Sequence, residues 1–125
     1  KISTWTNIST VAAGVDHILG LKKDGTVVAV GDNSEHQCEV EAWNDVVAIA
    51  AGRAHSIGLR FDGKVYGAGA DNVHQRNVAN WKDIVAIAAT YDHTIGMKTD
   101  ATLVAAGPAY AKHVHVQQAI VSADI

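Results

Sequence analysis

The sequence of 125 residues has little of several residue types on which particular folds and sites depend. With a single cysteine, Cys38, it has no partner for a disulfide within the chain and cannot form a zinc site of several thiolates. Its apolar residues never run unbroken for the ~20 positions that a membrane-spanning helix needs. The net charge of −3 is spread along the chain and leaves no basic face for a phosphate backbone. The composition therefore predicts a globular protein with no membrane span and no nucleic-acid partner.

Catalytic motifs are also missing. The sequence contains no G-x-S-x-G elbow, no phosphate-binding glycine loop and no H-E-x-x-H pattern. Cys38 has no base marked out beside it, so we interpret it as a small apolar side chain rather than a nucleophile. The best pair for a metal ion is His113 and His115, which share one face of a strand, but no third ligand is near in sequence. We predict no enzymatic activity, no cofactor and no metal site, with this pair as the nearest metal candidate.

What the sequence does contain is an internal repeat. Its three tryptophans, Trp5, Trp43 and Trp81, are spaced 38 residues apart. Laid over each other without gaps, consecutive repeats agree at 14 positions. The same spacing links further residues: His17, His55 and His93; Asp24, Asp62 and Asp100; Gly20, Gly58 and Gly96; Gly31, Gly69 and Gly107. Repeats of this length indicate solenoids or propellers. We predict a single repeat array over 1–125, with units at 5–42, 43–80 and 81–118 and the start of a degenerate fourth unit at 119–125.

Each repeat is expected to form three antiparallel strands, with a short fourth strand as a possible addition. In the second copy, the apolar run 46–51 predicts a buried strand, and 55–60 alternates as a half-buried strand does. The Asp-Gly pair at 62–63 predicts a tight turn before a third strand over 64–68, and an extended piece is expected around Val78. Sheets of this size, repeated about every 40 residues, are typical of β-propeller blades.

Three blades cannot close a propeller ring, which needs about four to eight. Three outcomes are therefore open: a fragment of a longer propeller, a ring completed by further copies of the chain, or a capped open arc. Glycines at 20, 58 and 96 fall inside predicted strands, where glycine usually signals a close backbone approach. Strands that converge on a central axis would create that crowding.

Two stretches resemble bacterial repeats of the regulator-of-chromosome-condensation family. They are W-x-D-[IV]-V-A-I-A-A-G-x-x-H-[ST]-I-G-L-[KR]-x-D-G over 43–63 and G-T-V-V-A-V-G-D-N-x-x-x-Q-C over 25–38. The resemblance implies an all-β propeller fold. By family analogy it also implies guanine-nucleotide exchange on a small GTPase as a less favoured function. His36 and His74 stand where the family has a glycine before the glutamine, and the third repeat drifts further, with Thr90 and Ala101 at two glycine positions.

Binding is predicted in the loops that vary between repeats, because a repeat scaffold fixes its strands and varies its loops. The loops before the repeated histidines would line one rim of the propeller. β-Lactamase-inhibiting members of the family are similar in repeat length and hold their enzyme with these loops. The predicted partner-binding residues are Val15, Asp16, Arg53, Ala54, Tyr91 and Asp92. Arg53 and Tyr91 are the expected anchors, since these residue types are enriched at interface hot spots.

The strictly repeated histidines and tryptophans are assigned structural roles. Each imidazole is expected to secure the loop before the second strand through a backbone hydrogen bond, and each indole to pack between blades. The function favoured is a non-enzymatic scaffold for a protein partner. The alternative is a self-assembling protein whose open flanks join further copies into rings or filaments. The compartment stays open, with a lean toward a secreted or cell-surface location.

Overall fold

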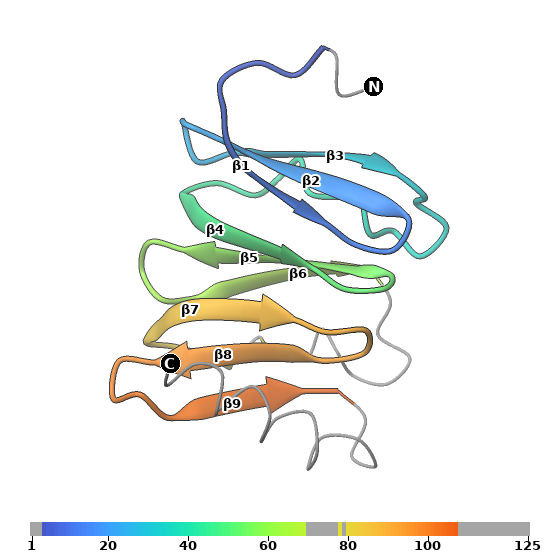
Figure 1. The fold of residues 1–125 in the computed structure, drawn as a ribbon. Coiled ribbons are helices and arrows are strands. Elements are labelled where there is room, and N and C mark those ends of the chain that lie inside the picture. The colour runs from blue at the N-terminus through green and yellow to red at the C-terminus, as the bar shows by residue number, and fades with distance from the viewer. Residues whose placement is uncertain (1–3, 70–77, 79, 108–125) are drawn as a thin grey trace.

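The computed structural model describes residues 4–69, 78 and 80–107, and within them it contains nine β-strands. They form three antiparallel sheets of three strands, each paired in chain order. The first sheet contains β1 (Ile8–Ala13), β2 (His17–Lys22) and β3 (Val27–Gly31); the second contains β4 (Val46–Ala51), β5 (His55–Arg60) and β6 (Val65–Gly69); the third contains β7 (Ile84–Ala89), β8 (Thr94–Lys98) and β9 (Leu103–Ala106). We call them blades 1, 2 and 3, and they follow one another along the molecule (Figure 1). The predicted all-β class is confirmed.

The three blades share one register. The middle strand carries the repeated glycine, and Gly58 pairs with Ile49 on one side and with Tyr66 on the other. Gly96 pairs in the same way with Ile87 and Val104. Residues 38 apart therefore occupy the same place in consecutive sheets, so one blade serves as an internal reference for the next.

The first strand of each blade is more exposed than the sequence predicts. An apolar run suggested a buried strand, yet Val11, Val47 and Val85 are 63%, 54% and 51% exposed. Side chains alternate between the two faces of a strand, and only one face is covered here: Val46 and Ile84, which precede Val47 and Val85, are 4% and 3% exposed. These runs are rich in small and β-branched residues because a pleated strand favours them, not because both faces are covered.

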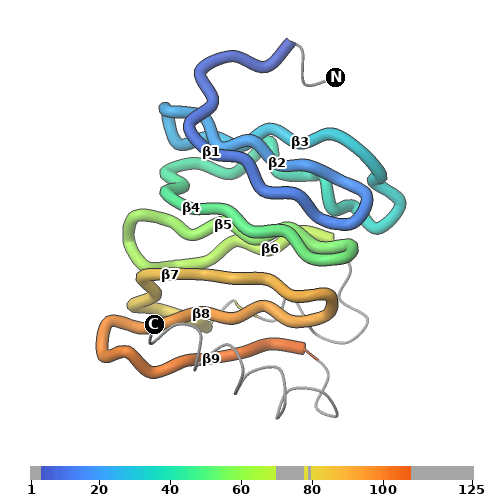
Figure 2. The backbone as a smooth tube through the Cα atoms, in the orientation of Figure 1, coloured from blue at the N-terminus to red at the C-terminus, as the bar shows by residue number. Residues whose placement is uncertain are grey.

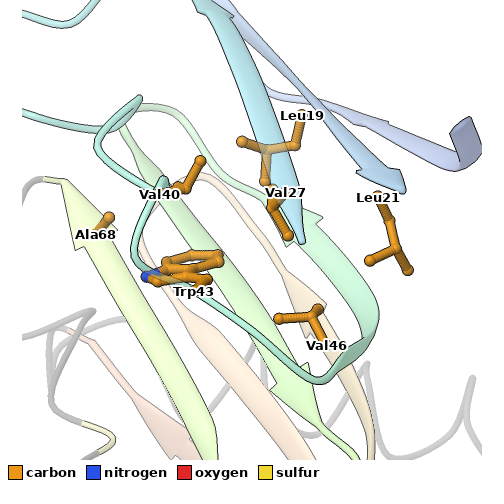
Figure 3. Packing of buried hydrophobic residues seen from close by; sticks show 7 residues of the cluster. All are labelled: Leu19, Leu21, Val27, Val40, Trp43, Val46 and Ala68. Atoms are coloured by element: carbon orange, nitrogen blue, oxygen red, sulfur yellow. The ribbon is translucent and has the colours of Figure 1, made fainter. Parts of the chain in front are cut away.

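A cluster of buried hydrophobic residues lies between blades 1 and 2. Trp43, 7% exposed, packs among buried side chains from both blades. Figure 3 shows the indole beside Val27 and Val40, with Val46 on the next stretch of chain. The buried members of the cluster are Leu19, Leu21, Val27, Val40, Trp43, Val46 and Ala68. The repeated tryptophan at this position joins its own blade to the preceding one.

The repeated strand glycines make room for these indoles. A Cβ atom on Gly58 would lie 2.9 Å from two ring carbons of Trp43, and one on Gly20 would lie 2.8 Å from a ring carbon of Trp5. The crowding that the sequence indicated is therefore real, but its cause is different. The tryptophan ring covers the glycine, whereas the sequence suggested strands converging on an axis.

The expected fourth strand is replaced by a turn in the described residues. Val40 and Val78, 2% and 3% exposed, precede the second and third tryptophans. The Trp43 N–H donates to the Val40 carbonyl over 3.0 Å, and the Trp81 N–H does the same to Val78. The side chain of the repeated valine is thus buried, and the turn that follows it places the indole in the interface with the preceding blade.

The turns between the second and third strands keep one geometry in all three blades. In each turn an aspartate accepts the N–H two residues later, as Asp24 does from Thr26 at 3.0 Å and Asp100 does from Thr102 at 3.0 Å. Gly25 adopts a φ of 87°, which suits glycine. Ala101, which stands at this glycine position in blade 3, adopts a φ of 71° and so keeps the same turn.

Replacing this alanine is expected to stabilise the protein. Ala101→Gly removes the penalty of a left-handed alanine, offset in part by greater freedom of the unfolded chain, for a net gain of about 0.5–1 kcal/mol. Urea unfolding measures the change. Gly63→Ala is the matched control and should destabilise, because its Cβ would lie 3.0 Å from the Asp83 backbone nitrogen. A loss of stability in Ala101→Gly would contradict the argument.

Candidate functional site

The predicted binding loops form a row along one edge of the blades. Each joins the first strand to the second and is closed by a short hydrogen bond: Gly14 N–H to the His17 carbonyl over 2.8 Å, and Gly52 N–H to the His55 carbonyl over 2.9 Å. Thr90 N–H closes the third loop in the same way. In Figure 2 these loops lie at the opposite end of the strands from the Asp-Gly turns. We call the row the rim.

Neighbouring rim loops contact one another directly. The Arg53 N–H donates to the Tyr91 carbonyl over 3.1 Å. A Cβ atom on Gly52 would overlap the imidazole of His55 and lie 2.6 Å from the Thr90 carbonyl oxygen. The loops of blades 2 and 3 are therefore packed closely and held by the backbone, which gives the side chains above them a fixed spacing.

The structure distributes the predicted binding residues unevenly. Val15 and Tyr91 project from the rim, at 61% and 62% exposed. Asp16 is exposed as well, whereas Asp92 is half-buried. Ala54 is only 7% exposed, so it offers little surface to a partner, and its partner contact stays a prediction. Its short methyl side chain faces inward from the loop.

Arg53, Tyr91 and Asp92 form one cluster across two blades. The Arg53 guanidinium carbon lies 5.1 Å from the centroid of the Tyr91 ring, within the range of a cation–π contact. Its Nε lies 3.9 Å from Asp92 Oδ1, and this buried nitrogen makes no hydrogen bond. The sequence named all three residues but did not indicate that they meet. Their offset of about one repeat is the signal that predicts it, because rim loops of adjacent blades are neighbours.

A shallow groove runs along the rim beside this cluster. Its volume is about 300 Å³, and all three loops contribute to it. The lining residues are Ala13, Gly14, Val15, Ala51, Gly52, Arg53, Ala89, Thr90 and Tyr91. Apart from Arg53, Thr90 and Tyr91 they carry small or apolar side chains, so the groove offers apolar surface with a few polar groups.

Beneath the rim, the first of the repeated histidines links its blade to the next. The Ser56 hydroxyl donates to the Gln37 carbonyl over 2.6 Å, and its oxygen lies 2.9 Å from Nε2 of His17. Since the hydroxyl proton is used for the carbonyl, Nε2 carries the proton of the neutral imidazole. His17 thus bonds across the blade interface, whereas the sequence suggested a bond to its own loop. Burial lowers the pKa of His17, against opposing contributions from the His55 backbone, Asp32 and Asp16.

His55 repeats this position one blade further on. It is fully buried, and neither ring nitrogen has a hydrogen-bond partner. Burial lowers the pKa of His55 to about 4, with the backbone of His93 acting in the opposite direction. The imidazole is therefore neutral at pH 7 and packs between blades 2 and 3. No acid–base role is indicated, because the ring is closed off from solvent.

The metal candidates and the cysteine give no built site among the residues that the structure describes. No group of three or more potential metal ligands occurs in that part of the chain. His113 and His115 lie outside the described residues. The Cys38 thiol is half-buried and donates to the Asp32 carbonyl over 3.4 Å, and burial raises its pKa. Over 4–69, 78 and 80–107 there is also no helix with the length and hydropathy of a membrane span.

Comparison with known proteins identifies the repeat. Residues 8–37 and 46–75 match the family profile described as the regulator of chromosome condensation (RCC1) repeat. The chain carries RCC1-like repeats. These segments cover the rim loops and the Asp-Gly turns of blades 1 and 2, which agrees with the resemblance seen in the sequence. The His36 backbone has a φ of 68°, a left-handed conformation that favours glycine, which is the residue that the family resemblance led us to expect there.

Solved structures show the same fold. Prp20p of Saccharomyces cerevisiae superposes with a TM-score of 0.69 at 24% identity, over 83% of this chain and 32% of that one. The ectodomain of the receptor kinase CR4 of Physcomitrella patens gives 0.69 at 20% identity, over 80% and 29%. Human WBSCR16 gives 0.66 at 24% identity, over 80% and 33%. The chain therefore spans about a third of each of these structures.

These likenesses support a partial propeller of RCC1-like blades. No curated protein sequence matches the chain. The structure of Prp20p was described with its binding to Gsp1p and histones, and yeast RCC1 (Prp20) was also solved bound to Kap60. The predicted similarity to β-lactamase-inhibiting members stays a prediction.

Proposed function

We propose that the chain is a non-enzymatic scaffold that binds a protein partner through its rim. The observation that carries this proposal is the cluster of Arg53, Tyr91 and Asp92, which two blades hold together on a hydrogen-bonded row of loops. An arginine stacked on an exposed tyrosine is already ordered before binding, so little side-chain entropy is lost when a partner covers it. Tyrosine and arginine are also the side chains most enriched at hot spots.

The shape of the rim suits a macromolecule better than a small ligand. The groove is shallow and is shared by three loops, and Val15 and Tyr91 rise beside it from blades 1 and 3. The rim carries charges of both signs, since Asp16 and Asp92 are acidic and Arg53 is basic. A partner with an apolar ridge flanked by a basic side chain would complement this surface. The reported protein complexes of the yeast relative Prp20 support protein binding as the function.

A double substitution tests the proposal. Arg53→Ala with Tyr91→Ala is expected to weaken partner binding by at least about tenfold, since a truncated hot-spot side chain typically costs about 2 kcal/mol or more. The immobilised chain would capture partners for quantitative mass spectrometry, and the partner enriched over background would then be purified for Kd measurement by calorimetry.

The opposite edge of the blades offers a matched control. Phe61 is 69% exposed and lies 6.0 Å from the Arg60 guanidinium carbon, so Phe61→Ala removes a similar exposed aromatic from an arginine. It should leave partner binding unchanged. Equal affinity of the rim variant and the wild-type chain for every purified partner would reject the proposal.

A second candidate function is self-assembly through the flank of blade 1. A cavity of about 410 Å³ lies on this blade, with Ile18 and Val30 in its wall. Blade 2 has Ser56 and Ala68 at these positions, inside its interface with blade 1. The more apolar pair favours contact with another apolar surface, a further copy included. Sedimentation velocity measures the native mass, and a monomer at all concentrations would exclude this function. We do not propose guanine-nucleotide exchange, because no feature of the described residues favours it.

A further inference from the structure

A small cavity opens on blade 3 beside Trp81, away from the rim. Its volume is about 140 Å³. The lining residues are Asn80, Trp81, Lys82, Ile84, Lys98 and Val104. Trp81 is half-buried, whereas Trp43, its counterpart in blade 2, is 7% exposed. The indole of blade 3 therefore keeps accessible surface that the indole of blade 2 has lost.

In blade 2 the corresponding space is filled by a side chain of the protein itself. The Tyr66 ring stacks on Trp43 with centroids 5.3 Å apart and planes 7° from parallel. Its hydroxyl accepts a hydrogen bond from Arg60 Nη1 over 2.7 Å and donates to Asn44 Oδ1 over 3.1 Å. An aromatic ring with a polar oxygen at its outer end thus completes the site.

The register shows what differs in blade 3. Tyr66 pairs with Gly58 across strands β5 and β6, and Val104 pairs with Gly96 across β8 and β9. Valine is shorter than tyrosine by the whole phenol ring, so the cavity beside Trp81 corresponds to the place of the ring in blade 2. A cavity of about 150 Å³ lined by apolar side chains accommodates benzene, so the size fits one aromatic ring.

The polar end of the cavity is cationic. Lys98 pairs with Ile84 as Arg60 pairs with Val46, so it occupies the arginine position, and Lys82 occupies the position of Asn44. Both ammonium groups donate only, so the acceptor that Asn44 offers to a phenol is missing from this position. Hydrogen bonds from Thr102 lower the pKa of the Asp100 carboxyl, and the charge of Lys98 adds to this shift, while Asp83 is exposed nearby. An oxygen that accepts one hydrogen bond from each of the two ammonium groups would complete the cavity.

We propose that this cavity binds a small aromatic anion. A six-membered ring stacks on the exposed part of Trp81 in the manner of Tyr66, and its carboxylate or phenolate oxygen faces Lys82 and Lys98. The site does not depend on the rim and would operate whether or not the rim binds a protein.

Titration with 4-hydroxybenzoate tests the proposal. We expect saturable binding, measured by calorimetry, and quenching of tryptophan fluorescence that is reduced in Trp81→Phe. Cyclohexanecarboxylate has the charge without the aromatic face, and p-cresol has the ring without the carboxylate. Each should bind at least about fivefold more weakly, since stacking and charge each contribute about 1 kcal/mol or more. Equal affinity for all three compounds, or no binding of 4-hydroxybenzoate at 10 mM, which is about the weakest affinity that such contacts leave, would overturn the proposal.

Substitutions then test whether the ligand binds in this cavity. Val104→Tyr fills the cavity as Tyr66 does in blade 2 and should abolish binding. Val28→Tyr makes the same change at the equivalent position of blade 1 and should leave binding intact. Lys98→Gln gives an independent result that does not depend on how a new ring packs, and should weaken 4-hydroxybenzoate while leaving p-cresol unchanged. Unaltered binding in both Val104→Tyr and Lys98→Gln would place the ligand elsewhere and reject the site.

Discussion

Trp43→Ala is expected to lower the free energy of unfolding by about 3–5 kcal/mol, the range found when a large aromatic is removed from a core. Trp43 contacts side chains of blade 1 and covers Gly58 of blade 2, so its loss opens a cavity in the interface between these blades. It also takes away the ring on which Tyr66 stacks. Small domains have stabilities of about 5–15 kcal/mol, so this loss is a large fraction of the total and should lower the urea midpoint markedly.

Urea unfolding followed by circular dichroism measures this loss. Val47→Ala is a suitable control, because Val47 is 54% exposed on the outer strand β4 and its truncation should change stability by less than about 0.5 kcal/mol. Trp43→Phe should retain part of the stability, since it keeps a ring over Gly58. A loss below about 1 kcal/mol in Trp43→Ala would show that blades 1 and 2 are not held together by this core.

Stability should also fall as the solution becomes acidic. His55 has a pKa of about 4 in the folded chain and an ordinary value of 6.5 when unfolded. The unfolded state therefore binds the proton first, so the contribution is fully present above pH 6.5 and is lost as the pH falls toward 4. The total loss from this residue is on the order of 3 kcal/mol. His17, whose pKa is also lowered by burial, acts in the same direction.

Unfolding free energies measured from pH 7 to pH 4.5 test this expectation. His55→Gln should flatten the pH dependence over this interval, whatever its effect on stability at pH 7. His36→Gln is the matched control, because the His36 side chain is 73% exposed and pairs with Glu39 at the surface. Parallel pH profiles for His55→Gln and the wild-type chain would contradict the assignment.

The repeat of 38 residues was sufficient to predict which residues are equivalent. From it followed the all-β class, the three sheets and two strands of blade 2 at their observed bounds, Val46–Ala51 and His55–Arg60. A periodic pattern specifies equivalence because every copy must fold in the same way. It does not specify which face of a strand is covered, and for this reason Val47 was expected in the core.

The contacts between blades could not be predicted from the sequence. Trp43 packs over Gly58, and His17 forms a hydrogen bond with Ser56. Both contacts depend on how one sheet lies against the next. The open space beside Trp81 has a sequence signal, namely valine in place of Tyr66 one repeat later. This substitution predicts an open space only once the stacking of Tyr66 on Trp43 is known.

In the part of the chain that the structure describes, the hydrogen bonds between blades join each blade only to its neighbour. The Val46 N–H donates to the Gly25 carbonyl and the Ile84 N–H to Gly63, each across one interface. In such a chain the folding energy is a sum of unit and nearest-neighbour terms. Blade 2 takes part in two couplings and blades 1 and 3 in one described coupling each, so damage to the middle unit uncouples both ends. By the same reasoning, inserting or deleting one whole 38-residue unit would leave every remaining coupling intact, so the length of the array can evolve in steps of one blade.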